Sequence, residues 1–170
     1  SYALGGNALA LWIINKPDVT TVTDEAGAFV ARTINYYDGA PFVGVQGQIL
    51  TRGILTRVDE FIDATRSVST KRVRYDSFGN IEESHDAVGH VRLVTWDPVF
   101  RTLPVTVTMV EGGGWANLSI TAAYDYAFGS ITNSIDFNGN STSYQYDSFG
   151  RLVRVVRPGD TAALPTSRFE

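Results

Sequence analysis

The side chains of this sequence with the clearest potential for acid–base or metal chemistry are aspartates that stand at regularly spaced turns. Most consecutive members of the series are 10 or 11 residues apart: Asp24, Asp76, Asp86, Asp97, Asp125, Asp136 and Asp147. A catalytic acid occurs once in a cleft, whereas here the same acid returns at turn after turn, which indicates a repeated structural unit. We therefore predict that these carboxylates close turns by accepting hydrogen bonds from backbone N–H groups.

The two histidines, His85 and His90, flank Asp86 and are the first residues to consider for a zinc site. Such a site needs a third ligand and imidazoles that converge on one point. His90 instead occupies the position after a turn glycine that Asn80 and Arg151 occupy elsewhere. We expect it to be a turn residue rather than a metal ligand.

Residues 136–140 carry oxygen-bearing side chains at alternate positions, as a calcium-binding loop does. That loop requires a glycine at its sixth position and a glutamate at its twelfth. This sequence has Ser141 and Asp147 there. A hairpin turn centred on Asn138 and Gly139 is the better prediction.

Other residue patterns that carry catalysis are weak in this sequence. The glycine run Gly112–Gly114 is not followed by the Lys-Ser/Thr pair of a phosphate-binding loop. The sequence has no cysteine, and both histidines stand near turns. It therefore offers few residues that could form a nucleophile–base pair. We predict that the chain is not an enzyme and has no catalytic, cofactor-binding or metal-binding residue.

Several aromatic residues could form a surface on which a carbohydrate or a single-stranded nucleic acid stacks. They are Tyr36, Tyr37, Trp96, Trp115, Tyr144 and Tyr146. Because their spacing follows the alternation of β-strands, core and cross-strand packing is the more common meaning of such a pattern.

Four basic residues gather between positions 66 and 74, namely Arg66, Lys71, Arg72 and Arg74. Acidic residues at positions 59, 60 and 63 precede them, and the formal net charge of the chain is −4. A protein that binds nucleic acid normally shows a basic stripe. We expect a solvated strand face here and no nucleic-acid partner.

A sequence motif recurs along the chain: an aromatic residue, aspartate, two or three further residues and glycine. Residues 75–80 read Tyr-Asp-Ser-Phe-Gly-Asn, residues 146–151 read Tyr-Asp-Ser-Phe-Gly-Arg, and a looser copy begins at Tyr124. The glycine allows a positive φ in a tight turn, and the aromatic ring packs across the strand pair. This repeat predicts an all-β fold of successive antiparallel hairpins that form a continuous curved sheet.

The hydrophobic pattern places strands between these turns. We expect strands at residues 8–14, 19–23, 29–37, 80–84, 90–96, 103–110, 116–124 and 151–157. Residues 71–76 lead into the region of strict repeats. Residues 48–56 could form a further strand. Residues 56–67 have a hint of helical spacing, but their apolar side chains fit a strand pair better. The long return arm after Asp24 predicts a β-bulge.

The composition is that of a globular protein, with 44% hydrophobic and 19% charged residues over 170 positions. We expect one domain over residues 1–170, with irregular entry hairpins at 1–70, strict repeats at 71–157 and a loop at 158–170. The longest apolar run, at residues 8–14, is too short to span a bilayer, so no direct membrane insertion is expected. A first residue that is not methionine and an end directly after a loop lead us to expect a segment of a longer chain.

The repeated Tyr-Asp-x-x-Gly phrase resembles the YD repeat of Rhs (rearrangement hot spot) proteins. More narrowly, the sequence resembles the B component of bacterial insecticidal toxin complexes and related virulence-plasmid proteins. Three stretches carry this likeness: residues 36–44 with 52–57, residues 96–100 with 103–108, and residues 146–152 with 157–160. The sequence departs from the pattern after Asp125, where Tyr-Ala-Phe-Gly-Ser replaces the usual residues.

In that family the repeats coil as a strip of β-sheet into a hollow shell, which encloses a toxic C-terminal polypeptide until delivery. The resemblance therefore implies a structural wall segment of a secreted toxin component. It implies as partners the remainder of the same polypeptide, a partner shell subunit and the enclosed toxic domain. It carries over no functional residue, because the toxic domain and the self-cleaving aspartates of the family lie elsewhere.

A binding module of a different kind is the alternative. The chain could be a stand-alone β-module that binds cell-surface carbohydrate through exposed aromatic side chains, with Trp115 and Tyr144 as the residues to test.

Overall fold

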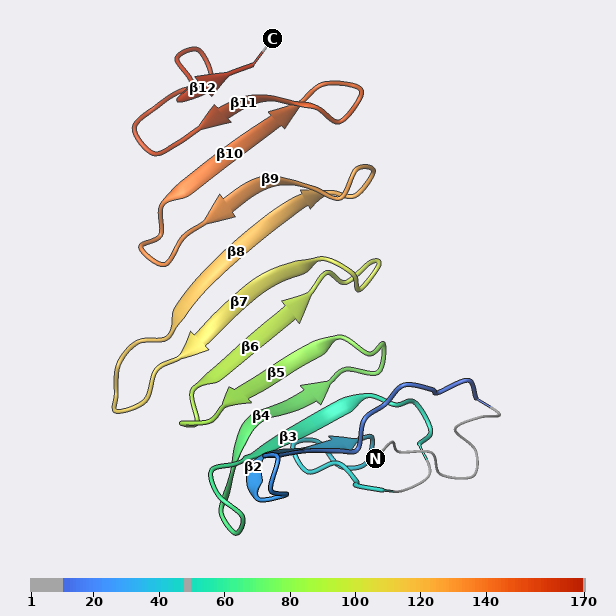
Figure 1. Cartoon of the computed structure of the whole chain (residues 1–170). Helices are drawn as coiled ribbons and strands as arrows, with labels where there is room; N and C mark the ends of the chain where they lie inside the picture. The colour runs from blue at the N-terminus through green and yellow to red at the C-terminus, as the bar shows by residue number, and fades with distance from the viewer. Residues whose placement is uncertain (1–10, 48–49, 170) are drawn as a thin grey trace. The chain divides into compact units, whose positions relative to one another are not determined.

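The computed structural model describes residues 11–47 and 50–169, and in this part of the chain it contains twelve β-strands and no helix. Neighbouring strands of the sheet follow the order of the sequence, and the strand pairs within each unit are antiparallel. The prediction of an all-β fold built from successive antiparallel hairpins is confirmed (Figure 1). The chain divides into two compact units, Ser1–Val91 and Arg92–Glu170.

The N-terminal unit contains five strands, each paired with the next. They are β1 (Val19–Thr23), β2 (Phe29–Tyr37), β3 (Leu55–Phe61), β4 (Ser67–Tyr75) and β5 (Ile81–Asp86). Alternating valine and threonine in β1 and the β-branched and aromatic residues of β2 suit a pleated, half-buried surface. The predicted bulge after Asp24 is present, because the register of β1 and β2 shifts between Val22 and Thr23.

The C-terminal unit continues the same plan. β6 (Val91–Trp96) begins at the boundary between the units, and the other strands are β7 (Pro104–Val110), β8 (Leu118–Asp125), β9 (Ser130–Ile135), β10 (Ser141–Tyr146), β11 (Leu152–Val156) and β12 (Ser167–Arg168). From β7 onward, each strand pairs with its successor. Proline stands at the first position of β7, where a missing N–H does not interrupt the ladder.

The best-buried apolar cluster lies in the N-terminal unit. Tyr37 and Leu50 are almost fully buried against each other, and Ile13 and Leu55 pack around them. Val73 in β4 is also fully buried. Leu50 belongs to a segment without regular structure, so this unit covers part of its sheet with irregular chain rather than with a helix or a second sheet.

Three expected elements differ in the structure. Residues 8–10 lie outside the described residues, and 11–14 are not a strand: Trp12 has a φ of 54° and Asn15 a φ of 61°, which end extended backbone. Of the possible strand at 48–56, residues 48–49 lie outside the described residues, and 50–54 are a loop, because the N–H groups of residues 51–54 donate to the Asp38 carboxylate instead of a neighbouring strand. The helical alternative for 56–67 is wrong, since β3, a turn and the start of β4 occupy it.

The expected terminal loop at 158–170 also needs a correction. Ser167 and Arg168 form the short strand β12, which pairs with Val155 and Arg154 of β11. The intervening loop is closed by the Thr166 hydroxyl, which accepts a hydrogen bond from the Arg157 N–H at 2.9 Å and donates one to the Asp160 carboxylate. These bonds turn the chain back onto the sheet.

We expect Leu50→Ala to lower the free energy of unfolding by about 2–5 kcal/mol, because it opens a cavity against Tyr37. Urea unfolding measures this loss. Val43→Ala is the control, since Val43 lies in the same irregular segment but is 54% exposed, and its effect should stay within about 0.5 kcal/mol. Equal losses in the two variants would show that Leu50 is not part of the core.

Candidate functional site

The repeated Tyr-Asp turn is the feature of this chain from which a function can be argued. In the turn at Asp76, the aspartate N–H donates to the Asn80 carbonyl at 2.9 Å, and the carboxylate accepts the N–H groups of Phe78 and Asn80. The turn at Asp147 has the same bonds, with Phe149 and Arg151 as donors. The predicted role of these aspartates in closing turns is confirmed.

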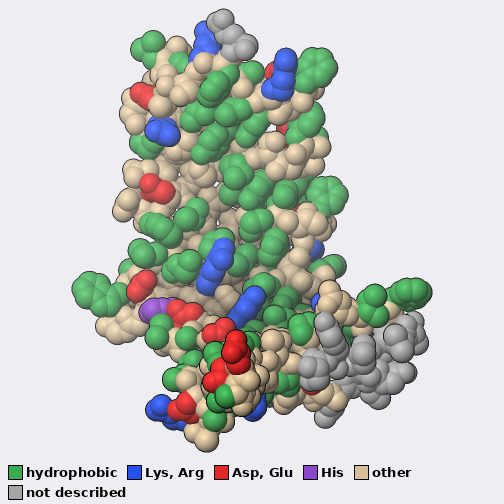
Figure 2. Space-filling model, in the orientation of Figure 1, with side chains coloured by type: hydrophobic (Ala, Val, Ile, Leu, Met, Phe, Trp, Pro, Cys, Tyr) green, Lys and Arg blue, Asp and Glu red, His purple; other side chains and the backbone are tan. Residues whose placement is uncertain are grey.

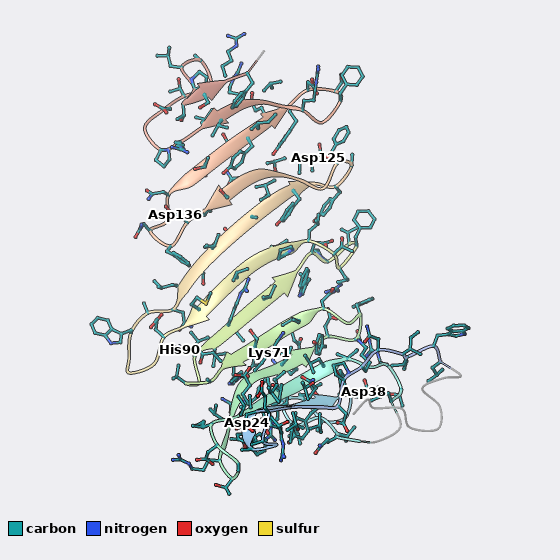
Figure 3. The ribbon with its side chains drawn as sticks, viewed as in Figure 1. Asp24, Asp38, Lys71, His90, Asp125 and Asp136 are labelled. Carbon is teal, nitrogen blue, oxygen red and sulfur yellow. The ribbon has the colours of Figure 1, made fainter. Side chains whose placement is uncertain are left out.

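The same closure occurs at both ends of the strands. Figure 3 shows Asp125 and Asp136 at opposite ends of β9, and both carboxylates accept a hydrogen bond from a backbone N–H two residues on. Asp24 and Asp86 close their turns with the N–H groups of Ala28 and His90, respectively. In each unit, an aspartate carboxylate that accepts backbone N–H groups therefore closes the turn between one strand and the next.

The irregular segment after Tyr37 is an enlarged version of this turn. The Asp38 N–H donates to the Ile54 carbonyl at 2.7 Å, and the Ile54 N–H returns a bond to the Asp38 carboxylate at 3.0 Å. The closing pair is 16 residues apart here (54 − 38), whereas it is 4 residues apart at Asp76 (80 − 76), so the turn carries 12 additional residues. The carboxylate also accepts the N–H groups of Thr51, Arg52 and Gly53.

The turn at Asp97 is a smaller enlargement. Its N–H donates to the Leu103 carbonyl at 2.8 Å, six residues on, and its carboxylate accepts four backbone N–H groups. The donors are Val99, Phe100, Thr102 and Leu103. The side chain is fully buried, and each of its oxygens accepts two of these bonds.

A β-bulge follows the Tyr-Asp turns at Asp38, Asp76, Asp125 and Asp147. Tyr75 pairs with Ile81 whereas Arg74 pairs with Glu83, so Glu82 is left out of the register. The residues skipped in the same way after the other tyrosine turns are Thr56, Thr132 and Val153. The turn at Asp136, which lacks the tyrosine, is followed by regular pairing between β9 and β10. A bulge thus accompanies each of these tyrosine turns, where it increases the local twist, and others occur beside the Asp24 turn and between β3 and β4.

The tyrosine of each such turn donates a hydrogen bond to a carbonyl one repeat earlier. The bonds are Tyr37 to Pro17 at 2.9 Å, Tyr75 to Leu55 at 2.8 Å, Tyr124 to Pro104 at 2.8 Å and Tyr146 to Ile131 at 2.9 Å. Two of these acceptors, Leu55 and Ile131, are the residues that pair with the preceding tyrosines. Each turn is thus tied to the one before it, so stability depends on neighbouring repeats.

Aromatic side chains inside the turns form a second link between successive turns. A Cβ placed on Gly150 would lie 2.8 Å from the Phe128 ring, so this ring packs directly on the next turn. Phe100 of one turn meets Tyr126 of the next edge-on, with ring centroids 5.6 Å apart. Gly150 also has a φ of 76°, a conformation that glycine adopts without strain.

Hydrogen bonds hold several turn carboxylates ionised. At Asp97, burial acts to raise the pKa, but the N–H groups of Leu103 and Phe100 and the other two donors outweigh it and lower the pKa well below its ordinary value. At Asp147, the N–H of Arg151 is the largest cause of a lowered pKa. The exposed Asp63 carboxylate has its pKa lowered to about 2, first by the Thr65 N–H and then by the Arg66 side chain.

The histidines do not converge on one point. The ring of His85 contacts the Glu83 carboxylate at 2.7 Å, and the ring of His90 contacts the Asp86 carboxylate at 2.7 Å inside its own turn. Within residues 11–47 and 50–169, no three acidic or histidine side chains are grouped so that they could hold a metal ion.

The residues of the suspected calcium loop close a hairpin. The Asp136 carboxylate accepts the N–H groups of Asn138 and Asn140, and the Asn140 amide donates to it at 3.1 Å. The arginines from 66 to 74 have local partners as well, and Arg72 donates to the Asp86 carbonyl at 3.4 Å. Arg66 pairs with Asp63, and Arg74 contacts two glutamates of β5 at 2.9 and 2.7 Å.

The aromatic residues considered as a stacking surface occupy different environments. Tyr37 is buried, the Tyr36 ring faces the Arg57 guanidinium at 4.6 Å, and the Tyr146 hydroxyl is bonded to the sheet. Trp115, by contrast, is 79% exposed in the connection between β7 and β8. Tyr144 lies in β10 with its hydroxyl 3.4 Å from the Ser134 hydroxyl.

A cavity of about 280 Å³ lies in the N-terminal unit between the enlarged turn and the turn at Asp76. Asp38, Arg52, Tyr75 and Asp76 contribute to its lining. Both carboxylates are already occupied by turn N–H groups, and the tyrosine hydroxyl is bonded to Leu55. These polar groups therefore serve the fold. In the part of the chain that the structure describes, no helix is long and apolar enough to cross a membrane.

Comparison with known proteins agrees with this repeat. The family model named RHS Repeat matches residues 124–162. Two solved structures share the fold: the crystal structure of TcdB2-TccC3 (TM-score 0.57, 15% identity, 84% of this chain) and the Photorhabdus luminescens Tc holotoxin pore (TM-score 0.60, 14% identity, 89% of this chain). This chain spans only 8% of the length of either solved chain. No curated protein matches the sequence.

We expect stability to fall in acid. Because the folded-state pKa values of turn aspartates lie below the unfolded value of 3.8, their contribution is present above that pH and is lost as the pH falls toward the folded values. Urea unfolding at a series of pH values should show a plateau from about pH 7 to 5 and a decline below about pH 4.

Asp97→Asn should lower the plateau and make this decline shallower, because an amide nitrogen cannot accept the two N–H groups that one carboxylate oxygen accepts. The exposed Glu111→Gln should leave both unchanged. An identical acid profile in Asp97→Asn and the wild type would contradict this assignment.

Gly150→Ala should destabilise the chain more than Gly129→Ala does. Both glycines have positive φ, but a Cβ at Gly129 meets nothing within 4 Å whereas one at Gly150 meets the Phe128 ring. We expect a difference of roughly 1 kcal/mol from this crowding. A double-mutant cycle with Phe128→Ala measures it, and the difference should disappear in that background. If it persists, the ring is not the cause.

Proposed function

We propose that this chain, whose residues 124–162 match the RHS Repeat family model and whose fold is shared with Tc toxin structures, is a structural, non-catalytic wall segment of a toxin shell. The shell would enclose a toxic C-terminal polypeptide until delivery. Its partners would be the remainder of the same polypeptide, a partner shell subunit and the enclosed toxic domain. The site of action would be outside the producing bacterium, as a secreted insecticidal component.

The observation that carries this proposal is the link between successive turns. The tyrosine of each Tyr-Asp turn donates a hydrogen bond to a carbonyl one repeat earlier, as Tyr146 does to Ile131. The Phe128 ring packs on Gly150, the glycine of the next turn. Such links let a strip of sheet extend by adding units of one kind, with no requirement for a separate core at each step. A wall needs this property, whereas a catalytic site needs one unique cleft.

The protonation state of the turn aspartates also supports a structural role. A catalytic carboxylate must be free to exchange a proton near the operating pH. Those of Asp97 and Asp147 are held ionised by backbone donors, so they are poor proton donors at neutral pH.

The proposal is tested in the full-length polypeptide that carries this chain, assembled with its partner subunit. We expect limited proteolysis to leave an enclosed C-terminal segment intact in the wild type. The double substitution Asp125→Ala and Asp147→Ala, which removes two turn closures of the C-terminal unit, should open the wall and make that segment cleavable. Trp115→Ala, at an exposed connection, is the matched control and should leave the protection unchanged.

The carbohydrate-binding alternative has one observation in its favour, the exposure of Trp115. It predicts saturable sugar binding that is lost in Trp115→Ala or Tyr144→Ala. Glycan-array binding with these properties, together with the absence of any protease-protected segment, would replace the wall proposal with this alternative.

A further inference from the structure

One face of the sheet in the C-terminal unit is mainly apolar in β7 and β8 and at the tyrosine turns, whereas Ser134 of β9 and Thr142 of β10 are polar residues on the same side. Met109 pairs with Leu118 and Val107 with Ile120, and alternation along β8 puts Leu118 and Ile120 on the same side as Tyr124. Tyr124 in turn pairs with Ile131. We call this side the tyrosine face. Figure 2 shows hydrophobic side chains gathered over the strands of this unit.

The opposite side of the same strands is polar. Thr108 pairs with Ser119, and their hydroxyls are 2.9 Å apart. Gln145 pairs with Arg154, whose guanidinium donates to the glutamine side chain at 3.0 Å. Exceptions are Ile135, which pairs with Thr121, and Val156, which pairs with Ser143 on this side. The two faces of the unit therefore differ sharply in chemistry.

The tyrosine face is only half-buried in this chain. The exposed fractions of Met109, Leu118, Ile120 and Ile131 lie between 37% and 40%. Antiparallel sheets commonly expose one face to solvent and pack the other face against a core. The packed face is the apolar one. A contiguous apolar face with this much exposure is typical of an interaction surface.

Polar atoms on the tyrosine face are already engaged within the sheet. The hydroxyls of Tyr124 and Tyr146 donate to backbone carbonyls, and the Tyr144 hydroxyl lies 3.4 Å from that of Ser134. Sugar recognition requires polar groups aimed at the ligand hydroxyls. A face whose hydroxyls are engaged instead offers non-directional apolar contact, which accepts many sequences.

The N-terminal unit shows what covers the equivalent position. Tyr37 and Leu55 form the pair there that Tyr124 and Ile131 form in the C-terminal unit. Leu50, from a segment without regular structure, buries this pair together with Ile13. An irregular stretch of polypeptide with apolar side chains is therefore a cover that this repeat already accepts.

We propose that the tyrosine face of the C-terminal unit is a docking surface for an extended, apolar segment of the enclosed polypeptide. The proposal rests on the proposed function for the identity of the occupant. It assigns this face to the inner side of the wall, and the polar face to the solvent. Contact without directional bonds would hold the segment without selecting one sequence or one fold for it.

Site-specific photocrosslinking in the assembled full-length protein tests this assignment. Ile120 or Thr121, neighbours in β8 with opposite orientation, is replaced with benzoylphenylalanine, and crosslinked peptides are identified by mass spectrometry. We expect position 120 to label apolar stretches of the protected segment several-fold more than position 121 does. In a second pair of variants, Ile120→Asp should reduce labelling from position 107, the cross-strand partner of Ile120, about tenfold. Thr121→Asp should not.

The outcomes separate the two proposals. A protease-protected segment that is labelled equally from both positions, or mainly from position 121, would overturn the face assignment and leave the wall intact. Crosslinks that join the tyrosine faces of two copies of the chain would also overturn it. If no segment is protected and neither position labels one, the wall proposal fails and the face assignment fails with it.

Discussion

The structure depends on one interaction, a carboxylate that accepts backbone N–H groups at the point where the chain reverses. A tight reversal leaves N–H groups that no strand can satisfy, and burying them without partners is costly. The aspartate resolves this locally, with its own N–H bonded across the turn and its carboxylate bonded inside it, as at Asp76 and Asp147. Because each turn is complete in itself, the strands between turns need no large core. Among the residues that the structure describes, the largest fully buried side chains are Leu50, Val73 and Asp97.

Aromatic residues connect these turns to one another along the sheet. A tyrosine hydroxyl bonds one repeat back, and the phenylalanine before a turn glycine, such as Phe128, contacts one repeat forward. Neither link requires the rest of the protein. A chain built in this way can be long, and its stability accumulates from neighbour to neighbour. The present chain spans 8% of the length of the solved toxin chains that share its fold.

The sequence predicted the parts of the fold that are encoded over short distances. The turn aspartates, the antiparallel hairpins and the bulge after Asp24 follow from residue types within a few positions of one another. The enlarged turn at Asp38 was not recognised, because its closing partner, Ile54, is far along the chain and nothing in the residue type marks it. The hydroxyl acceptors and the two-residue strand β12 were likewise missed. They depend on which carbonyls and edges become neighbours only after pairing is complete.

The enlarged turn shows where such a protein can change in length. Twelve residues enter between Asp38 and Ile54 while β2 and β3 keep the same antiparallel pairing and the same bulge as other repeats. The entropic cost of closing a loop rises only slowly with its length. Insertions can therefore collect at the tyrosine turns over evolution, and the strands remain conserved in register. For engineering, the same property makes these turns natural grafting positions, where a foreign peptide can be displayed without rebuilding the sheet.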